Sequence, residues 1–371
     1  IDGPTYGIDL DCKITNSLIN MSTCHSYGHL KTYNLAAMIN NTCAFHFVPA
    51  CDGDKFAWKM ICKPEGPILR EIKDRAIKED DLVKLGIVLH AWADSYSHQG
   101  FSGLFSKPND IQELQANSKV YLSKGMYTSS FIVWIRRDIL KSNFDHTFDR
   151  LVPPYGHAQA LNYPDEPYIR EWSYEYDKND IFYKGHKIPV RNNIKTYKKA
   201  FESITGILTN FLDRYPAHRE TNSSYPKTPS SELFEFLFIR KNVEKREKKW
   251  IKKLSQMAPF KESNEKDIQY DDRLWLSEAF INYKPDSKIF TERNKLSLNR
   301  KVRRIVNGAR LNPEFADSNW YKYHRAVHWY KEQFHELCHK YDLAFDHAPY
   351  FPKKSEKLLA SLAAKNRRYS H

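Results

Sequence analysis

From residue 67 onward, apolar residues recur every three or four positions, which is the spacing of one face of an α-helix. Pro67 suits the first position of a helix, Asp80 and Asp81 suit the cap and first turn of the next, and Gly100 suits its end. The pattern predicts helices over residues 68–78, 80–97, 117–142, 194–214, 231–256, 271–283, 289–306, 317–343 and 354–368.

Two long stretches lack this periodicity. Residues 1–66 are predicted to be irregular, and residues 151–193, which are rich in Pro and Tyr, are predicted to form an ordered loop rather than a strand. The sequence shows no internal repeat and no sustained alternation of apolar and polar residues. The expected fold class is therefore mainly α.

The most informative helix is the one that carries His90, Asp94 and His98. Their spacing of four stacks the three side chains along one stripe of a helix. Val83 and Ile87 fall on the same stripe, which predicts that it is buried, and the opposite face is predicted to be core: Leu82, Leu85, Leu89, Trp92 and Tyr96. A buried carboxylate between two imidazoles needs compensating charge, which a divalent cation supplies. The alternative is a hydrogen-bonded core histidine with two surface neighbours.

Further residues of metal-ligand type lie in unusual local surroundings. His46 stands inside the apolar run 45–49, where it is either a ligand or a core histidine bonded to the backbone. His157 and Asp165 lie in the predicted loop 151–193, the kind of segment on which sites are often built. Imidazole and carboxylate donors together suit zinc or a similar metal.

The segments around these residues resemble those of known protein families. His90-x-x-x-Asp94 on a buried helix resembles the metal-binding helix of the zinc-dependent phospholipase C and single-strand nuclease superfamily. Over about residues 30–175 the chain also looks like an uncharacterised bacterial domain family, a suspected distant relative, through Phe45-His46-Phe47-Val48-Pro49, Leu89-His90-x-Trp92-Ala93-Asp94-x-x-Ser97-His98-Gln99-Gly100-Phe101-Ser102-Gly103 and Gly156-His157-Ala158-x-x-x-x-x-Pro164-Asp165.

The resemblance implies an all-α fold around two or three divalent metal ions, zinc by expectation, that hydrolyses phosphate esters. The implied ligands are His46, His90, Asp94, His98, His157 and Asp165, with Asp94 bridging. Two features depart from the superfamily pattern. Its next histidine follows the aspartate by six residues, whereas His98 follows Asp94 by four, and Ile1 and its neighbours offer no early histidine ligand.

Charge is distributed unevenly along the chain. The formal net charge is +13; residues 1–180 carry 19 Lys and Arg against 23 Asp and Glu, and residues 181–371 carry 39 against 22. The basic half indicates an anionic partner, either a phosphodiester or phospholipid substrate or nucleic acid, and its densest runs are 240–253 and 295–310. A solvated Lys-rich surface is the alternative. With a linker predicted at 218–230, the expected domains are a metal-binding helical domain, 1–225, and a basic helical region, 226–371, which can also pack as one.

Other compositional features narrow the class of protein. Aromatic residues make up 14% of the chain, so a packed core is expected and general disorder is excluded. No apolar run approaches the roughly 18 residues of a membrane helix. No leader pattern is present, so a cytoplasmic location is expected, with a removed leader left open. Five of the six Cys fall in the first 62 residues without a C-x-x-C pair; we expect thiols, and disulfides of an exported protein are the alternative.

Two further functions compete with the hydrolase. His335-Glu336-Leu337-Cys338-His339 matches the H-E-x-x-H motif of zinc metalloproteases, although Lys340 follows where that motif prefers an uncharged residue. A non-enzymatic, metal-stabilised helical module that binds nucleic acid or a protein partner through its basic half is the other alternative. The nucleotide-binding, kinase and serine-hydrolase motifs are absent from the sequence.

Overall fold

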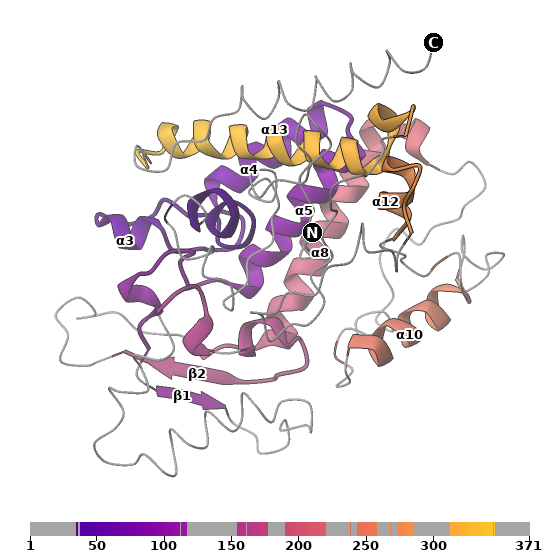
Figure 1. Ribbon diagram of the computed structural model, residues 1–371. Helices are drawn as coiled ribbons and strands as arrows, with labels where there is room; N and C mark the ends of the chain where they lie inside the picture. The colour runs from indigo at the N-terminus through magenta and orange to yellow at the C-terminus, as the bar shows by residue number, and fades with distance from the viewer. Residues whose placement is uncertain are drawn as a thin grey trace. The chain divides into compact units, whose positions relative to one another are not determined.

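The structure is a computed structural model. It describes residues 35, 38–111, 113–116, 154–160, 162–176, 190–219, 238, 243–257, 268, 273–284, 312–343 and 345. The described part is mainly helical (Figure 1). The chain divides into two compact units. Unit 1 comprises residues 1–51, 66–91 and 271–371, and unit 2 comprises residues 52–65 and 92–270. The division falls inside one continuous helix, α5 (Leu82–Ser97).

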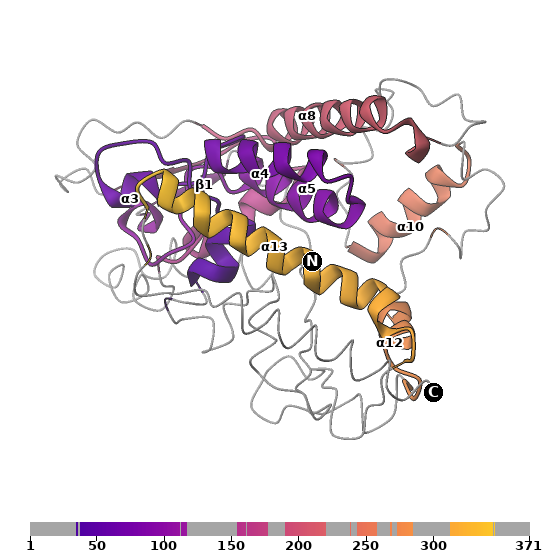
Figure 2. The same cartoon turned by 90° about the horizontal axis from the view of Figure 1, so that it is seen from above.

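Unit 1 is organised around one long helix, α13 (Asn319–Lys340). It packs against α4 (Pro67–Lys78), α12 (Arg273–Ala279) and the π-helix η2 (Met38–His46), and the short 3-10 helix η12 (Phe315–Asp317) precedes it (Figure 2). Aromatic and aliphatic side chains at helical spacing form its buried face: Trp320, Tyr323, Val327, Tyr330, Phe334 and Leu337. Apolar burial along this face is the main stabilisation of unit 1.

The pairing of α4 with α13 combines apolar burial with ion pairs at the edge. Ile68, Leu69 and Ile72 of α4 are completely buried. Arg75 donates two hydrogen bonds to the carboxylate of Glu336, at 2.8 and 3.0 Å, and Lys340 donates to both oxygens of Glu71. Because each pair includes one well-exposed partner, Glu336 or Lys340, these ion pairs add little to stability and mainly fix how the two helices align.

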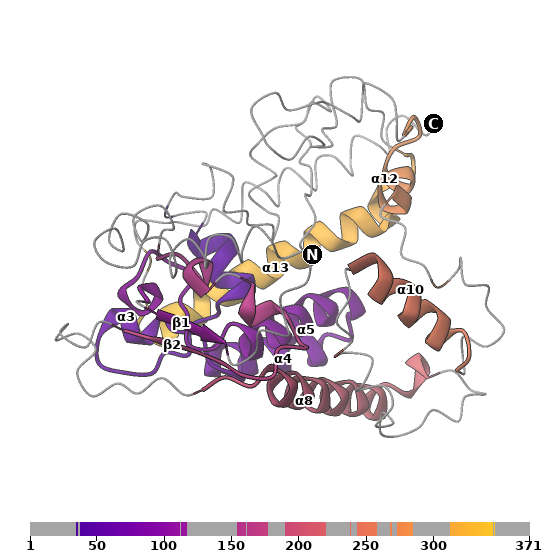
Figure 3. The ribbon, with the colours of Figure 1, turned by 90° about the horizontal axis from the view of Figure 1, so that it is seen from below.

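Unit 2 holds the remaining elements. They are α3 (Phe56–Lys59), η3 (Lys107–Asn109), β1 (Glu113–Ala116), η7 (Ala158–Ala160), η8 (Tyr163–Asp165), β2 (Trp172–Glu175), α8 (Asn193–Arg214), η10 (Pro216–His218) and α10 (Val243–Leu254). Strands β1 and β2 form an antiparallel two-stranded sheet in which Glu113 lies opposite Glu175 and Ala116 opposite Trp172 (Figure 3).

Helix α5 begins and ends as its sequence predicts. The carboxylate of Asp81 accepts hydrogen bonds from the backbone N–H groups of Val83 and Lys84, at 2.9 and 3.0 Å, which is an N-cap. Gly100 has φ +91°, and a Cβ at this position would lie 2.9 Å from the hydroxyl of Tyr174. Both facts require glycine where the chain turns back after the helix.

The predicted fold class, mainly α, is confirmed, and predicted helices recur as α4, α5, α8, α10, α12 and α13. Three expectations were wrong. Residues 1–66 were expected to be irregular but contain η2 and α3, and the predicted loop 151–193 contains strand β2. Leu82 was assigned to the core but is 56% exposed, because α5 starts there and its first turn extends beyond the packed face.

Several expectations concern residues outside the described part of the chain. They are the helices at 117–142, 289–306 and 354–368, the basic run 295–310, and residues 220–230 of the linker, so the boundary near 225 stays a prediction. The predicted thiols agree with the structure where it describes them, because Cys43, Cys51, Cys62 and Cys338 form no disulfide among the described residues.

Candidate metal centre

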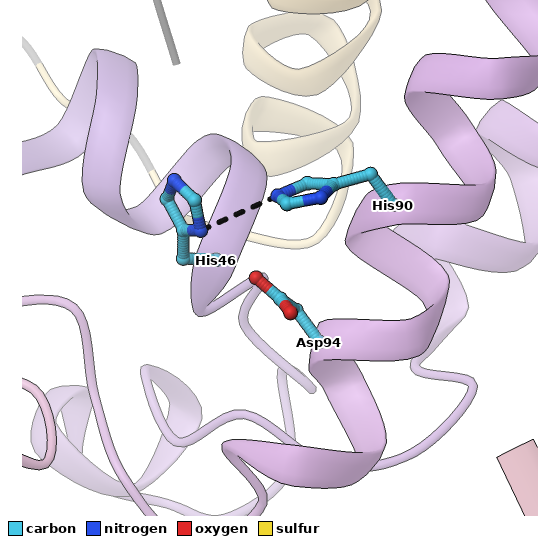
Figure 4. A group of neighbouring side chains, drawn as sticks. All are labelled: His46, His90 and Asp94. Carbon is cyan, nitrogen blue, oxygen red and sulfur yellow. Dashed lines mark hydrogen bonds between the residues drawn. The ribbon is translucent and has the colours of Figure 1, made fainter. Parts of the chain in front are cut away.

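The first group of metal-ligand type comprises His46, His90 and Asp94. His90 and Asp94 lie on successive turns of α5, and His46 is the last residue of η2. One ligand atom from each lies within 4.8 Å of the others, and His90 Nε2 lies 3.4 Å from His46 Nδ1. Figure 4 shows the three side chains directed toward one common space. His46 is buried, and the other two are half-buried.

The second group comprises His98, His157 and Asp165, all in unit 2. His98 Nε2 lies 2.9 Å from Asp165 Oδ1, and His157 Nε2 lies 3.3 Å from Asp165 Oδ2. Both imidazoles are buried, whereas the side chain of Asp165 is 47% exposed. Burial raises the pKa of Asp165, but the charges and hydrogen bonds of His157 and His98 outweigh it and hold that pKa well below its usual value.

Asp94 brings the two groups next to each other. His98 directly follows the last turn of α5, and its backbone N–H donates to the carbonyl of Asp94 at 2.8 Å. The side chains of the same two residues also approach, with His98 Nδ1 3.7 Å from Asp94 Oδ2. The spacing of four therefore brings the carboxylate of Asp94, a member of the first group, next to His98 Nδ1, while the other ring nitrogen of His98, Nε2, faces Asp165.

A buried arginine holds the chain where it leaves α5. Arg191 is 5% exposed and donates to the carbonyl oxygens of Ser97, at 2.8 Å, and Gln99, at 2.7 Å. Its guanidinium also lies over the ring of Trp172, 4.9 Å from the centroid. Arg191 thus supplies hydrogen-bond donors and positive charge to carbonyl oxygens at the C-terminal end of α5. These two bonds fix the backbone on both sides of His98.

A buried asparagine holds the turn that carries Asp165. The side-chain amide of Asn193 donates to the carbonyls of Tyr163, at 2.6 Å, and Glu166, at 2.8 Å. Its own carbonyl accepts from the indole of Trp172 at 2.8 Å. Asn193 is completely buried, and its two hydrogen bonds hold both ends of the turn that carries Asp165. Asn193 therefore fixes the orientation of this aspartate without contacting a ligand atom itself.

Tyr197 of α8 lies near the carboxylates of both Asp94 and Asp165. Its hydroxyl donates to the carbonyl of Pro164 at 3.1 Å. Burial raises the pKa of Tyr197 strongly, and the negative charges of Asp165 and Asp94 raise it further. The sequence interpretation missed Tyr197, Asn193 and Arg191. Their contacts are with residues far away in the chain, and none of the three belongs to a recognisable sequence motif.

The other face of α5 is tied to α8 by a small polar network. Glu65 accepts hydrogen bonds from the hydroxyls of Tyr96 and Ser203, and the indole of Trp92 donates to Ser203 at 3.0 Å. Trp92 and Tyr96 are buried at 2% and 7% exposure. These two residues therefore have the core role expected for them, and the network fixes the rotation of α5 about its axis.

All six residues singled out in the sequence thus gather into the two groups, and no residue expected there lies elsewhere. Whether they bind metal stays a prediction. The donor sets fit it, since each group offers two imidazoles and one carboxylate, the set found in zinc enzymes with three protein ligands. Without a cation these contacts are ordinary hydrogen bonds, between imidazole and carboxylate in the second group and between the two imidazoles in the first, which is the alternative interpretation.

A comparison with protein-family models gives one match. The model of the family of unknown function DUF6765 matches residues 2–338, which is most of the chain. The chain belongs to this family. No curated protein and no solved structure matches it.

The DUF6765 match is longer than the resemblance found in the sequence, which covered about residues 30–175. It includes both groups of candidate ligands and ends at Cys338, one residue before His339 of the H-E-x-x-H motif. In that motif, Glu336 pairs with Arg75, and His335 Nε2 lies 2.5 Å from the side-chain oxygen of Asn40. Neither histidine belongs to a candidate metal group among the described residues.

No helix in the described part of this DUF6765 protein is both long and apolar enough to cross a membrane.

Proposed function

We propose that this protein is a metal-dependent hydrolase of phosphodiesters or phospholipids. The observation that carries the proposal is the gathering of six donor residues into two groups of three, with Asp94 of the first group in contact with His98 of the second. Four imidazoles and two carboxylates in this arrangement fit two zinc-like cations, each with room for a ligand that does not come from the protein.

In this proposal His46, His90 and Asp94 hold one cation and His98, His157 and Asp165 hold the second. Bound divalent cations would supply an activated water near neutral pH and positive charge for the phosphoryl oxygens. The neighbouring residues position these ligands: Asn193 fixes the turn of Asp165, and Arg191 fixes the chain around His98.

The reaction class draws on the resemblance of His90-x-x-x-Asp94 to the zinc-dependent phospholipase C and single-strand nuclease superfamily. A negatively charged substrate also agrees with the net charge of +13. The competing module, in which metal only stabilises the fold, predicts one site with four protein ligands and no open position. The two groups of three favour the enzyme.

Two measurements on the full chain test the proposal. Elemental analysis after dialysis is expected to find about two zinc-like ions per chain. The metal-loaded protein is expected to hydrolyse bis(p-nitrophenyl) phosphate, and Asp94→Asn is expected to reduce the rate by at least about 100-fold. Asp74→Asn is the matched control, because Asp74 is an exposed aspartate of α4 whose side chain is 59% accessible.

The outcomes separate the interpretations. A single ion that resists chelators, with no hydrolysis of phosphodiesters, would favour the structural module. Absence of any bound metal, in a protein whose thermal unfolding is also unaffected by added zinc, would refute both. Equal rates for Asp94→Asn and Asp74→Asn would show that hydrolysis comes from elsewhere.

A further inference from the structure

The two candidate groups differ in how far their carboxylates reach solvent. The side chain of Asp165 is 47% exposed, whereas that of Asp94 is 20% exposed. The buried imidazoles do not differ in this way, since His46 is 3% exposed and His98 and His157 are each 5% exposed. Water and small solutes therefore reach the second group through Asp165, while the single carboxylate of the first group lies deeper.

The second group also has a hydrogen-bonded arrangement that needs no cation. The two oxygens of Asp165 each face one imidazole nitrogen, His98 Nε2 at 2.9 Å and His157 Nε2 at 3.3 Å. A cation that binds these atoms has to displace both contacts, because the lone pairs of the nitrogens must then point at the metal. In the first group the contact between His46 Nδ1 and His90 Nε2 is longer, at 3.4 Å. Displacing two hydrogen bonds instead of one longer contact lowers the affinity for a cation by roughly tenfold.

The elements that carry the two carboxylates differ in the same direction. Asp94 lies on α5, a helix of 16 residues, whereas Asp165 ends η8, a 3-10 turn of three residues between loop segments. Connecting segments are more mobile than the long elements they join. The carboxylate of Asp165 is therefore the easier of the two to withdraw from a cation.

We propose that the first group retains its cation, that the second group exchanges its cation with the solution, and that free metal ion thereby regulates hydrolysis. When the second group is empty, the two hydrogen bonds of Asp165 close it. When it is filled, its cation faces the exposed side, where the phosphoryl oxygens of a substrate arrive. The regulation of hydrolysis rests on the proposed function, whereas the difference in retention depends only on the two groups binding metal.

Removal of metal by a chelator tests the difference in retention. The full chain is loaded with zinc, treated with increasing concentrations of pyridine-2,6-dicarboxylate, separated from the chelate by gel filtration and assayed for zinc. One ion per chain is expected to leave at a chelator concentration roughly tenfold lower than the other. Hydrolysis of bis(p-nitrophenyl) phosphate should fall as this ion leaves and return when zinc is added back.

Other outcomes contradict the proposal in different ways. Two ions that leave together would show that the groups retain metal equally, which overturns this inference and leaves the proposed hydrolase intact. Activity that persists until the resistant ion leaves would overturn the regulatory role of the second group. A chain that binds no zinc would refute the proposed function, and this inference with it.

Two matched histidine variants assign the ions to the groups. His157→Gln removes a ligand of the second group and His46→Gln one of the first, and both imidazoles are buried. His157→Gln is expected to lose the ion that leaves first and to keep the resistant one, and His46→Gln is expected to do the reverse. The opposite pattern would overturn the assignment. Asp165→Asn changes the second group at a half-exposed side chain and should reproduce His157→Gln, so the test does not depend on how one variant folds.

Inorganic phosphate tests which cation faces the substrate. With zinc in the resistant position and cobalt(II) in the exchangeable one, the visible absorption of cobalt reports on its ligands. Phosphate is expected to change this absorption, because the exposed side of Asp165 lets an anion reach the cation. An unchanged spectrum, or a change seen only when cobalt occupies the resistant position, would overturn the proposal.

Discussion

A single buried lysine provides the sharpest test of the packing in unit 1. Lys331 of α13 is completely buried; its ammonium donates to the side-chain oxygen of Asn41 at 2.9 Å and lies 5.7 Å from the ring centroid of Phe45. Burial lowers the pKa of Lys331 from 10.5 to about 7. We expect Lys331→Met, which keeps the length of the side chain and removes its charge, to stabilise the protein at neutral pH.

The magnitude follows from the two pKa values. Because the unfolded chain binds this proton more tightly, the free energy of unfolding rises with pH between about 7 and 10.5. Keeping the lysine buried costs about 4 kcal/mol at pH 7 and about 1 kcal/mol at pH 10. Leaving the amide of Asn41 without its donor costs about 1–3 kcal/mol at either pH. Lys331→Met should therefore gain about 2 kcal/mol at pH 7 and lose about 1 kcal/mol at pH 10.

The assay is urea unfolding of both proteins at pH 7 and pH 10, with the difference between them taken at each pH. Taking the difference cancels the other groups that titrate in this range. Lys322→Met on the same helix is the control, because Lys322 is exposed and its replacement should change stability by less than about 0.5 kcal/mol at both values. A difference between Lys331→Met and the unmodified protein that stays constant with pH would refute the reasoning.

Three more predictions follow from single contacts. Asn193→Ala should reduce zinc affinity by about 10–100-fold, measured by competition with a chelator, because the turn of Asp165 loses two hydrogen bonds; unchanged affinity would remove Asn193 from the site. In native protein treated with iodoacetamide, the half-buried Cys51 should react before Cys43, since burial raises the pKa of the Cys43 thiol; mass spectrometry of digested peptides decides the order. Glu336→Gln should leave phosphodiester hydrolysis within about twofold, because Glu336 pairs with Arg75; a larger loss would revive the H-E-x-x-H motif.

The parts of the site that could be predicted from the sequence are those that local geometry determines. A spacing of four on a helix brings His90, Asp94 and His98 to one stripe whatever the rest of the chain does. His46 was recognised by its apolar neighbours, and His157 and Asp165 by their place in the predicted Pro- and Tyr-rich loop 151–193. Their distribution into two groups could not be predicted, because it depends on contacts between residues far apart in the chain.

The features that sequence analysis missed depart from the usual preferences of residue type and spacing. Lys331 breaks the expectation that lysine stays at the surface, and the side-chain oxygen of Asn41, far away in the sequence, accepts a hydrogen bond from its ammonium. Arg191 lies in a stretch without periodicity, yet it binds the end of α5. Strand β2 is four residues long, and the alternation of Trp172, Ser173 and Tyr174 is too short to outweigh the surrounding loop composition.

The charge of the site gives the reason for expecting an anionic substrate. The six candidate ligands are four imidazoles, which bind metal as neutral groups, and two carboxylates. Two divalent cations would therefore leave the cluster with a net charge of about +2. A phosphodiester, which carries one negative charge, reduces that excess when it binds, whereas a neutral peptide does not. Asp94 is a member of the first group, and its carboxylate lies 3.7 Å from His98 Nδ1 of the second. Replacing Asp94 with an amide removes a ligand charge from the first group and, in the second, removes only the contact that orients the His98 ring. Loss of Asp94 should consequently weaken retention of metal strongly in the first group and less in the second, and loss of His46 should weaken it in the first group alone.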